Sequence, residues 1–458
     1  IYYIPSHIRK DTVADGSDIQ DRLVNLINVP DINLRSNLYT TEDFLDSLQV
    51  SKNYMADQNL YIRERIFDMW IGDWNKTNEN WEWQSHTVND SVIYTPIVID
   101  RNHAFTKVDG VLFKQMLKML SLDFICNYDS LILKDTKKIN KLAFALDMAV
   151  AGRSDESVWI RQAQEIRKQM TDSLIDSAFT YLPEGVKHDE IELIKRKLKR
   201  RRLELEAVAS QYYRLLQRTP VVAGTNQSDY FLIERQAPDR TILRIYDPET
   251  GDCRLEQQFS GKETKELWLY GLAGNDTFEV KGNTRKDFPI YLISGEGENQ
   301  YQLNHNRKIH VYDKDYKYDY QKIKYHKISF TPWGIYDSDK GISLDTFFTY
   351  TMYGFKRAPF TYQHRIGYNY LKGFMYAGIF PNYDGRRRLY LNASISSPRN
   401  FENFFGFGNN TAGYKEEKKN YNRVKLRTYM FNPSFEMDLR KEEVMTFFGS
   451  LDMYKAKR

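Results

Sequence analysis

Beyond Pro332 the sequence alternates between apolar and polar residues, and this alternation constrains the fold more than any other feature. Ile342, Leu344 and Phe348 would lie on one face of a strand, and Ser343 would lie on the other. Because strand side chains point alternately to opposite faces, the pattern predicts strands of roughly ten residues with one apolar and one strongly polar face. The same alternation recurs in residues 362–370, 388–395 and 423–430.

Strands of this kind occur in two architectures. A soluble β-sandwich also has one polar face, but long strands capped by aromatic residues favour a transmembrane barrel. We count about six such strands, whereas a bacterial barrel needs at least about eight. We therefore expect residues 332–458 to be the first strands of an antiparallel transmembrane β-barrel, with the sequence ending inside it. In the last stretch, Val424, Leu426 and Met430 would form the apolar face.

Composition excludes several classes of protein. The hydrophobic fraction of 41% is sufficient for folded cores. A net charge of +5 over 458 residues gives no reason to expect a nucleic-acid partner. Cys126 and Cys253 are the only cysteines, so neither a disulfide framework nor a cysteine-built zinc site can form. Apolar runs stay well below the roughly 18 residues of a transmembrane helix.

We predict a multidomain α+β chain. Its parts are a lead-in segment (residues 1–52), a helical module (53–220), a small all-β domain of short strands (221–331) and the barrel strands (332–458). In the helical module, residues 191–215 are predicted to form one long helix, whose apolar seam only Arg201 interrupts. The basic run at 195–202 would either contact anionic lipid or form a solvated helix face, and the solvated face is favoured.

Two glycine-rich turns stand out in the all-β domain, GLAGND at 271–276 and GEGEN at 295–299. They faintly resemble the turns of calcium β-rolls, in which Gly and Asp line a cation loop. Such turns bind through tandem short repeats, and these two are widely spaced. Ordinary turn chemistry is therefore the favoured explanation.

Residues 59–110 have the layout of a phosphoryl-transfer site. A helix with Ile62, Ile66 and Met69 on its apolar face, and with residues 63–65 turned away, ends at Gly72. A polar loop follows, and then an apolar edge strand, residues 94–99, leads to a second polar turn. The loop region also carries tryptophans at 74, 81 and 83, which form either a buried brace, the favoured role, or a stacking surface for a ligand.

Kinase-type chemistry needs an acid that orients the attacking hydroxyl, an Asn five residues later and a downstream Asp, and the last two hold metal. Position 75 and Asn80 have this spacing, and Asp100 supplies the downstream carboxylate. We expect Asn80 and Asp100 to lie near each other, although Asp100 also suits a simple turn. The candidate residues are Asp73, Asn75 and Lys76 for catalysis, and Asn80, Asp100 and Asn102 for a metal ion.

The segments GDWNKTNENW (72–81) and PIVIDRNHAF (96–105) resemble the atypical kinase-like segment of a family of large outer-membrane proteins of Bacteroidota. In that family an Asp-Trp-Asp-Arg-His loop ending in Asn and Trp precedes an Asp-Arg-Asp-x-Ala-Phe turn. Some members begin with a calcineurin-like metallophosphoesterase domain, and they end in a BamA-type surface-antigen barrel. FFGFGNNT (404–411) resembles a segment of such barrels, and the whole resemblance covers most of residues 55–455.

Four positions depart from the family pattern. Asn75 replaces the middle Asp of the first loop, Lys76 and Thr77 replace Arg and His, and Asn102 replaces the second Asp of the second motif. An amide cannot take a proton near neutral pH, so Asn75 cannot be a general base. The lost carboxylate at 102 also lowers the negative charge available to Mg²⁺. The resemblance therefore implies the remnant of a kinase-like C-lobe, a pseudokinase, rather than an active enzyme.

These inferences together predict an outer-membrane surface-antigen protein with periplasmic soluble modules, acting in membrane assembly, transport or partner binding. The expected partners are outer-membrane lipid and other outer-membrane or periplasmic proteins. A barrel that itself folds or exports membrane proteins fits the sequence equally well. The alternative is an outer-membrane-anchored phosphotransferase or phosphohydrolase that uses Asp73, Asn80 and Asp100 with Mg²⁺, the only cofactor under consideration.

Overall fold

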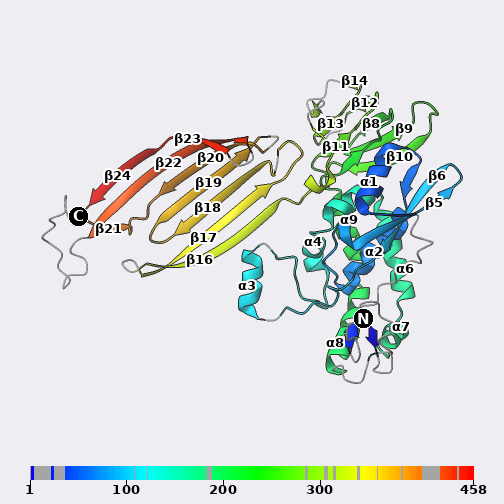
Figure 1. Ribbon diagram of the computed structural model, residues 1–458, viewed down its shortest axis with the longest axis horizontal. Coiled ribbons are helices and arrows are strands. Elements are labelled where there is room, and N and C mark those ends of the chain that lie inside the picture. Colours follow the sequence, from blue (N-terminus) through cyan, green and yellow to red (C-terminus); the bar gives the residue numbers. More distant parts are fainter. Residues whose placement is uncertain are drawn as a thin grey trace. The chain divides into compact units, whose positions relative to one another are not determined.

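The chain divides into two compact units in the computed structural model. Unit 1 comprises Ile1–Asp109 and Phe124–Gln321, and unit 2 comprises Gly110–Asp123 and Lys322–Arg458. The structure describes residues 2–4, 22–24, 37–108, 110–120, 122–180, 182, 188–283, 287–303, 308–312, 316–337, 341–357, 359–382, 385–404, 423–440 and 443–457. As predicted, it is a multidomain protein in which a helical region with small sheets precedes a large antiparallel sheet (Figure 1).

The first part of unit 1 pairs helices with a four-stranded sheet in the order β3-β5-β6-β4. Thr40 begins the first helix, because its side chain accepts a hydrogen bond from the Asp43 N–H. Gly72 ends the second helix in the left-handed conformation, with φ 79°, as the sequence predicted. The elements are β3 (Leu38–Tyr39), α1 (Thr41–Val50), β4 (Tyr54–Ala56), α2 (Gln58–Ile71), β5 (Trp81–Val88) and β6 (Ser91–Val98). A separate antiparallel pair joins β1 (Tyr2–Ile4) and β2 (Arg22–Val24).

Strand β6 is a central strand, and its prediction as an edge strand was wrong. It pairs with β5 on one side and, over residues 92–94, with the short strand β4 on the other. Pro96 lies beyond the end of β4, opposite Trp83 on β5. Proline lacks a backbone N–H, but no β4 residue lies opposite Pro96 to accept a hydrogen bond from it. Pro96 is therefore tolerated in this central strand.

Helices fill the rest of the first part of unit 1, and the long helix predicted at 191–215 is in fact two helices. The N–H groups of Leu203 and Glu204 bond to carbonyls three residues back, which tightens the backbone between the two helices. The side chain of Glu204, between the two helices, accepts a hydrogen bond from the Ile132 N–H at 3.0 Å. The helices are α4 (Thr136–Ile139), α5 (Phe144–Ala151), α6 (Glu156–Gln169), α7 (Asp172–Ala178), α8 (His188–Arg202) and α9 (Leu205–Leu216).

The basic run at 195–202 is not a purely solvated face. Arg201 is buried and donates to the carbonyls of Met69 (2.5 Å) and Trp70 (2.7 Å). Lys199 pairs with Asp176 of α7 at 2.7 Å. The apolar seam was interrupted at Arg201 because this arginine caps the C-terminal carbonyls of α2.

The small all-β domain has two sheets that share one apolar core. A parallel sheet has the order β15-β13-β11-β7, and a second sheet has the order β10-β9-β8-β12-β14. From β10 to β15 the chain passes from one sheet to the other at each strand. Phe231, Leu269 and Leu292 are fully buried in the core. The strands are β7 (Val221–Ala223), β8 (Tyr230–Gln236), β9 (Arg240–Tyr246), β10 (Cys253–Ser260), β11 (Leu267–Tyr270), β12 (Thr277–Gly282), β13 (Ile290–Ile293), β14 (Gln300–Leu303) and β15 (Ile309–Tyr312).

Gly297 offers a direct test of how closely successive turns of this domain approach each other. A Cβ at Gly297 would lie 1.8 Å from the Gly274 carbonyl oxygen, and φ is +113°. We expect Gly297→Ala to lower the free energy of unfolding by about 2–5 kcal/mol, from backbone strain and overpacking together. Gly251→Ala is the matched control, because φ is +78° and no atom lies within 4 Å of its Cβ. Its expected loss in urea unfolding is about 1–2 kcal/mol. Equal losses would contradict the close approach.

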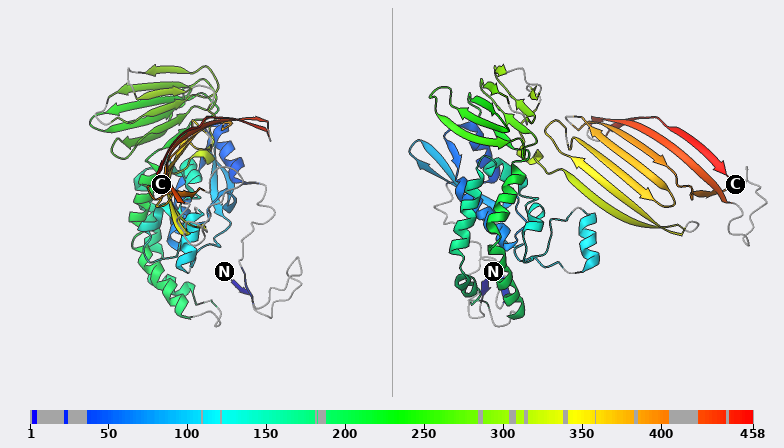
Figure 2. Two further views of the ribbon diagram at one scale, coloured as in Figure 1. Left: turned by 90° about the vertical axis from the view of Figure 1, so that its left-hand side faces the viewer. Right: turned by 180° about the vertical axis from the view of Figure 1, so that it is seen from behind.

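Unit 2 is built on a nine-stranded antiparallel sheet, which curves in the edge-on view of Figure 2. Neighbouring strands follow each other from β16 to β20, and β22 then pairs with β20, β21, β23 and β24. Within the described strands β16 pairs only with β17, so this part of the chain forms an open sheet. The strands are β16 (Lys327–Asp337), β17 (Gly341–Met352), β18 (Tyr362–Asn369), β19 (Gly373–Pro381), β20 (Arg387–Ile395), β21 (Phe401–Asn403), β22 (Arg423–Arg440), β23 (Glu443–Phe448) and β24 (Leu451–Lys457).

The two faces of this sheet differ as predicted over most strands. The backbone register aligns Phe348 with Phe330 and Ile366, and all three side chains are exposed. On the other face Asp345 and Asn369 are buried and hydrogen-bonded to each other at 2.7 Å. The FFGFGNNT segment lies outside the described residues except for Phe404.

The start of β22 does not follow the predicted alternation. Val424, Leu426 and Met430 share the face of Asn432, and Lys425 lies on the face of Phe431. That prediction was wrong because the register is set by the pairing of β22 with β20, not by local hydropathy.

One further helix belongs to unit 2. Helix α3 (Val111–Met119) contacts β16 and leaves Val111 and Leu112 exposed. No helix in the described part of the chain is both long and apolar enough to span a membrane.

Candidate functional site

The predicted site residues lie where α2 ends and β6 ends. Gly72 turns the chain out of α2 into the loop that carries Asp73, Asn75 and Lys76. A short 3₁₀ turn, η3 (Asn78–Asn80), then leads into β5. Since β5 and β6 pair antiparallel, with Trp81 opposite Val98, the start of β5 lies beside the end of β6. The structure thus brings Asn80 and Asp100 together, as expected from the sequence.

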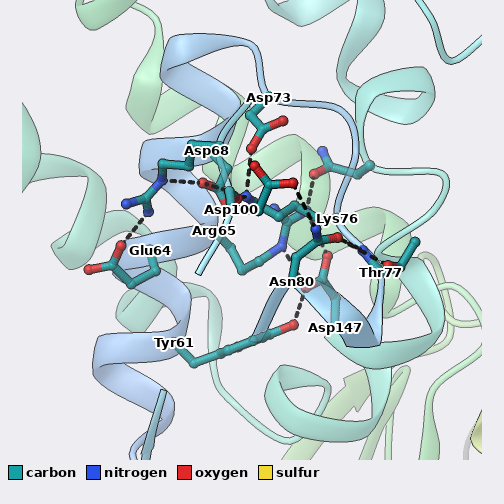
Figure 3. Close-up of polar contacts among 12 residues, drawn as sticks. Tyr61, Glu64, Arg65, Asp68, Asp73, Lys76, Thr77, Asn80, Asp100 and Asp147 are labelled. Atoms are coloured by element: carbon teal, nitrogen blue, oxygen red, sulfur yellow. Dashed lines mark hydrogen bonds and ion pairs between the residues drawn. The ribbon is translucent and has the colours of Figure 1, made fainter. Parts of the chain in front are cut away.

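Lys76 is the centre of the site. Its side chain is 1% exposed, and its ammonium lies 2.5 Å from Asp73 Oδ2 and 3.7 Å from Asp68 Oδ1. The same ammonium donates a hydrogen bond to the Asp100 carbonyl (Figure 3). A buried ammonium must be paired to be stable, and here two carboxylates and a carbonyl surround it. Lys76 is therefore a fixed internal cation.

The Asp73 carboxyl is held in a mixed environment. Burial raises its pKa, the Lys76 ammonium opposes that rise, and the charge of Asp68 adds to it. The net result is a pKa above the usual value of an aspartate. Asn75, in the same loop, is half-buried.

Asn80 and Asp100 contact each other directly. Asn80 Nδ2 donates to Asp100 Oδ2 at 3.4 Å, while Asn80 Oδ1 accepts from the N–H of Thr77 at 2.7 Å and from its hydroxyl at 3.0 Å. Asp100 Oδ1 accepts the Asn102 N–H at 2.7 Å, which is the turn-forming role considered from the sequence. Asn102 is exposed. The oxygens that would bind a metal ion are thus engaged in hydrogen bonds of the loop.

A buried charge network next to Lys76 was missed by the sequence analysis. Arg65 was expected to face away from the core, yet its side chain is 1% exposed. It pairs with Asp68 at 3.1 Å and with Asp147 of α5 at 2.8 Å. The network also includes Tyr61, Asn140 and Tyr212, and on the other side of Asp68 it includes Arg101 and Glu64.

One sequence signal could have revealed this network. Tyr61, Arg65 and Asp68 recur at spacings of four and three, which defines a polar stripe along α2 next to its apolar stripe. The partner, Asp147, lies 82 residues away from Arg65 and has no local signature.

The three tryptophans form the favoured buried brace. Trp83 is fully buried, stacks on Phe44 with a centroid distance of 3.7 Å, and donates to the Thr41 hydroxyl at 3.2 Å. Trp81 and Trp74 are also buried, and Trp74 donates to the Thr106 hydroxyl at 3.0 Å. The brace fixes both ends of the loop that carries Lys76.

No protein-family model matches the chain. No curated protein and no solved structure is significantly similar to it.

Ion pairs and burial hold the loop of the site in place. Its acids face an internal ammonium and an arginine network, and Lys76, Asp73 and Asn80 are all buried. Among the described residues no group of three or more Asp, Glu, His or Cys side chains is placed to hold a metal ion. The side chains that could contribute to an Mg²⁺ site in this region are Asn80, Asp100 and Asn102, the set predicted from the sequence.

Proposed function

We propose that this chain is part of an outer-membrane β-barrel protein whose helical module keeps a kinase-like loop without phosphoryl-transfer activity. One observation carries the proposal: the paired strands of unit 2 form a largely apolar face, on which Phe330, Phe348 and Ile366 are exposed. Its central row runs through Phe330, Phe348, Ile366, Tyr376 and Ala393 in register. Water would be a poor solvent for so large a face, whereas acyl chains would cover it.

The opposite face supports the same proposal, because it has the polarity of a barrel lumen. Asp345, Asn369 and Thr351 are buried there, and Arg365 lies over the Phe347 ring at 4.0 Å. Charged and amide groups on one face with aromatic and aliphatic groups on the other are the alternation of an outer-membrane strand. The resemblance to the Bacteroidota surface-antigen proteins points the same way.

A non-catalytic role for the loop is supported by Lys76 and Asn75. Lys76 occupies the space between Asp73 and the Asp100 backbone with its own positive charge. Asn75 provides no base. The module would then serve partner binding, transport or membrane assembly on the periplasmic side. The Mg²⁺-dependent phosphotransferase has less support, and micromolar binding of Mg²⁺-ATP in titration calorimetry would favour it.

A pair of arginine substitutions on neighbouring residues of β17 tests the membrane proposal. Phe348→Arg places a charge on the apolar face, and we expect it to destabilise the membrane-inserted protein by about 2–4 kcal/mol. Thr349→Arg is the control, because Thr349 lies on the polar face. The measurements are the membrane-integrated fraction after a carbonate wash and urea unfolding from lipid vesicles. The proposal fails if the protein stays in the aqueous fraction without detergent, or if both variants behave alike.

A further inference from the structure

Three turns of the small all-β domain stack on one another. They span 224–229, 271–276 and 294–299, and each connects a strand of the parallel sheet to a strand of the second sheet. Tyr270 pairs with both Ala223 and Ile293 just before the turns, and Thr277 pairs with both Tyr230 and Gln300 just after them. Equivalent positions of the three turns therefore lie directly above each other. We call this arrangement the turn stack.

The turn stack contains a ladder of side-chain oxygens from the last residue of each turn. The Asp229 N–H donates to Asp276 Oδ1 at 2.8 Å, and the Asp276 N–H donates to Asn299 Oδ1 at 2.9 Å. Asp229 Oδ2 accepts from the N–H of Thr225 at 2.7 Å and from its hydroxyl at 3.0 Å. Asp276 is 0% exposed, and its Oδ2 has no hydrogen-bond donor among the described residues.

Two buried carboxyl groups thus lie in adjacent turns. Two cations lie nearby, but both are engaged elsewhere. The Lys52 ammonium is held by the Ser228 carbonyl at 2.6 Å and by Asp247 at 3.1 Å, and the Arg153 guanidinium donates to the Ala223 carbonyl. Burying two carboxyl groups in adjacent turns is costly, and a cation between the turns would offset that cost.

A backbone oxygen lies near each carboxyl group, the Ser294 carbonyl near Asp276 and the Gly271 carbonyl near Asp229. A Cβ on Gly271 would lie 2.2 Å from Asp276 Oδ2 and 2.5 Å from the Ser294 carbonyl oxygen. A Cβ on Gly224 would lie 2.7 Å from Asp229 Oδ2 and 3.2 Å from the Gly271 carbonyl oxygen. Glycine at these positions leaves room for carboxylate and carbonyl oxygens to approach each other. Carboxylates, carbonyls and water, at about 2.3–2.6 Å, are the ligands of Ca²⁺.

We propose that the turn stack binds Ca²⁺ between turns 224–229 and 271–276, with the carboxylates of Asp229 and Asp276 as its charged ligands. Backbone carbonyls and water complete the coordination, and Asn299 supports Asp276 from the third turn. The wide spacing of the glycine-rich turns in the sequence favours ordinary turn chemistry over a calcium β-roll. The β9–β10 hairpin accounts for the largest gap, and the parallel pairing removes it in space.

Calcium titration of the complete, chelator-treated chain tests this proposal independently of the membrane proposal. We expect saturable binding in the range of extracellular calcium modules, about 10⁻⁴–10⁻³ M, by calorimetry with CaCl₂. Ca²⁺ should also raise the melting temperature. Asp276→Asn should keep the Oδ1 ladder and the fold, since an amide oxygen still accepts the Asp229 N–H. It should weaken Ca²⁺ binding by at least about tenfold.

Glu298→Gln is the matched control, because Glu298 is an exposed acid in the third turn. It should leave the affinity for Ca²⁺ unchanged. Circular dichroism in chelator confirms that each variant is folded. The proposal is overturned if the folded wild-type chain binds no Ca²⁺ at millimolar concentration, or if Asp276→Asn binds it as tightly as the wild type. Either outcome would leave Asp276 as a purely structural acid of the ladder.

Discussion

Replacing Arg65 with alanine should lower the free energy of unfolding of unit 1 by about 3–5 kcal/mol. The side chain is 1% exposed and is shared by Asp68, Asp147 and Asn140. Removing it leaves the buried Asp147 carboxylate without its cation, whereas Asp68 keeps Arg101 at 2.8 Å. The cost of the uncompensated buried charge dominates the change. The loss is large because the pair is buried; an exposed pair would change stability little.

Urea unfolding followed by tryptophan fluorescence measures this effect. Six of the seven tryptophans, all except Trp333, lie in unit 1, so the signal reports its unfolding. Arg167→Ala is the control, because Arg167 forms an exposed pair with Glu206. We expect the control to lose less than about 1 kcal/mol. A loss for Arg65→Ala no larger than that of the control would contradict the buried network.

Replacing Lys76 with methionine should also destabilise unit 1 by about 3–5 kcal/mol at neutral pH. Methionine keeps much of the side-chain volume but removes the ammonium that faces Asp73 and Asp68. It also removes the donor to the Asp100 carbonyl. Because the apolar part of the side chain is retained, the loss in the free energy of unfolding measures the contribution of the ammonium rather than that of packing.

The pH dependence of Lys76→Met follows from Asp73. Its pKa is already raised in the folded protein by burial, and loss of the Lys76 charge would raise it further. A folded-state pKa above the unfolded value means that the folded protein binds more protons. The free energy of unfolding then falls as the pH rises from the unfolded-state pKa of Asp73 to its folded-state pKa, and it recovers as the pH is lowered. Lys76→Met should therefore approach wild-type stability toward acidic pH.

The double variant Asp73→Asn, Lys76→Met isolates this pair. It removes both charges, so it should be more stable than Lys76→Met alone at neutral pH and should lack its pH dependence. Urea midpoints at pH 5 and pH 7 provide the comparison. A double variant as unstable as Lys76→Met at pH 7 would show that Asp73 is not the group that Lys76 neutralises.

Local periodicity was enough to predict much of the fold. The alternation at Ile342–Phe348 gave the two faces of β17, and Gly72 marked the end of α2. The loop from Asp73 and the strand ending near Asp100 were also visible, together with the approach of Asn80 to Asp100. Each of these depends on neighbours in the chain or on one hairpin, so short windows of sequence contain the necessary information.

Long-range pairing decided what the sequence left open. Arg65 and Arg201 look like solvated charges in their own helices, but partners up to 132 residues away bury them. Lys76 became an internal cation only when the α2 terminus and the end of β6 met around it. The turn stack likewise arises because parallel strands align turns that a hairpin separates in sequence. Charge compensation and strand register depend on contacts across the whole fold, so tertiary structure alone fixes them.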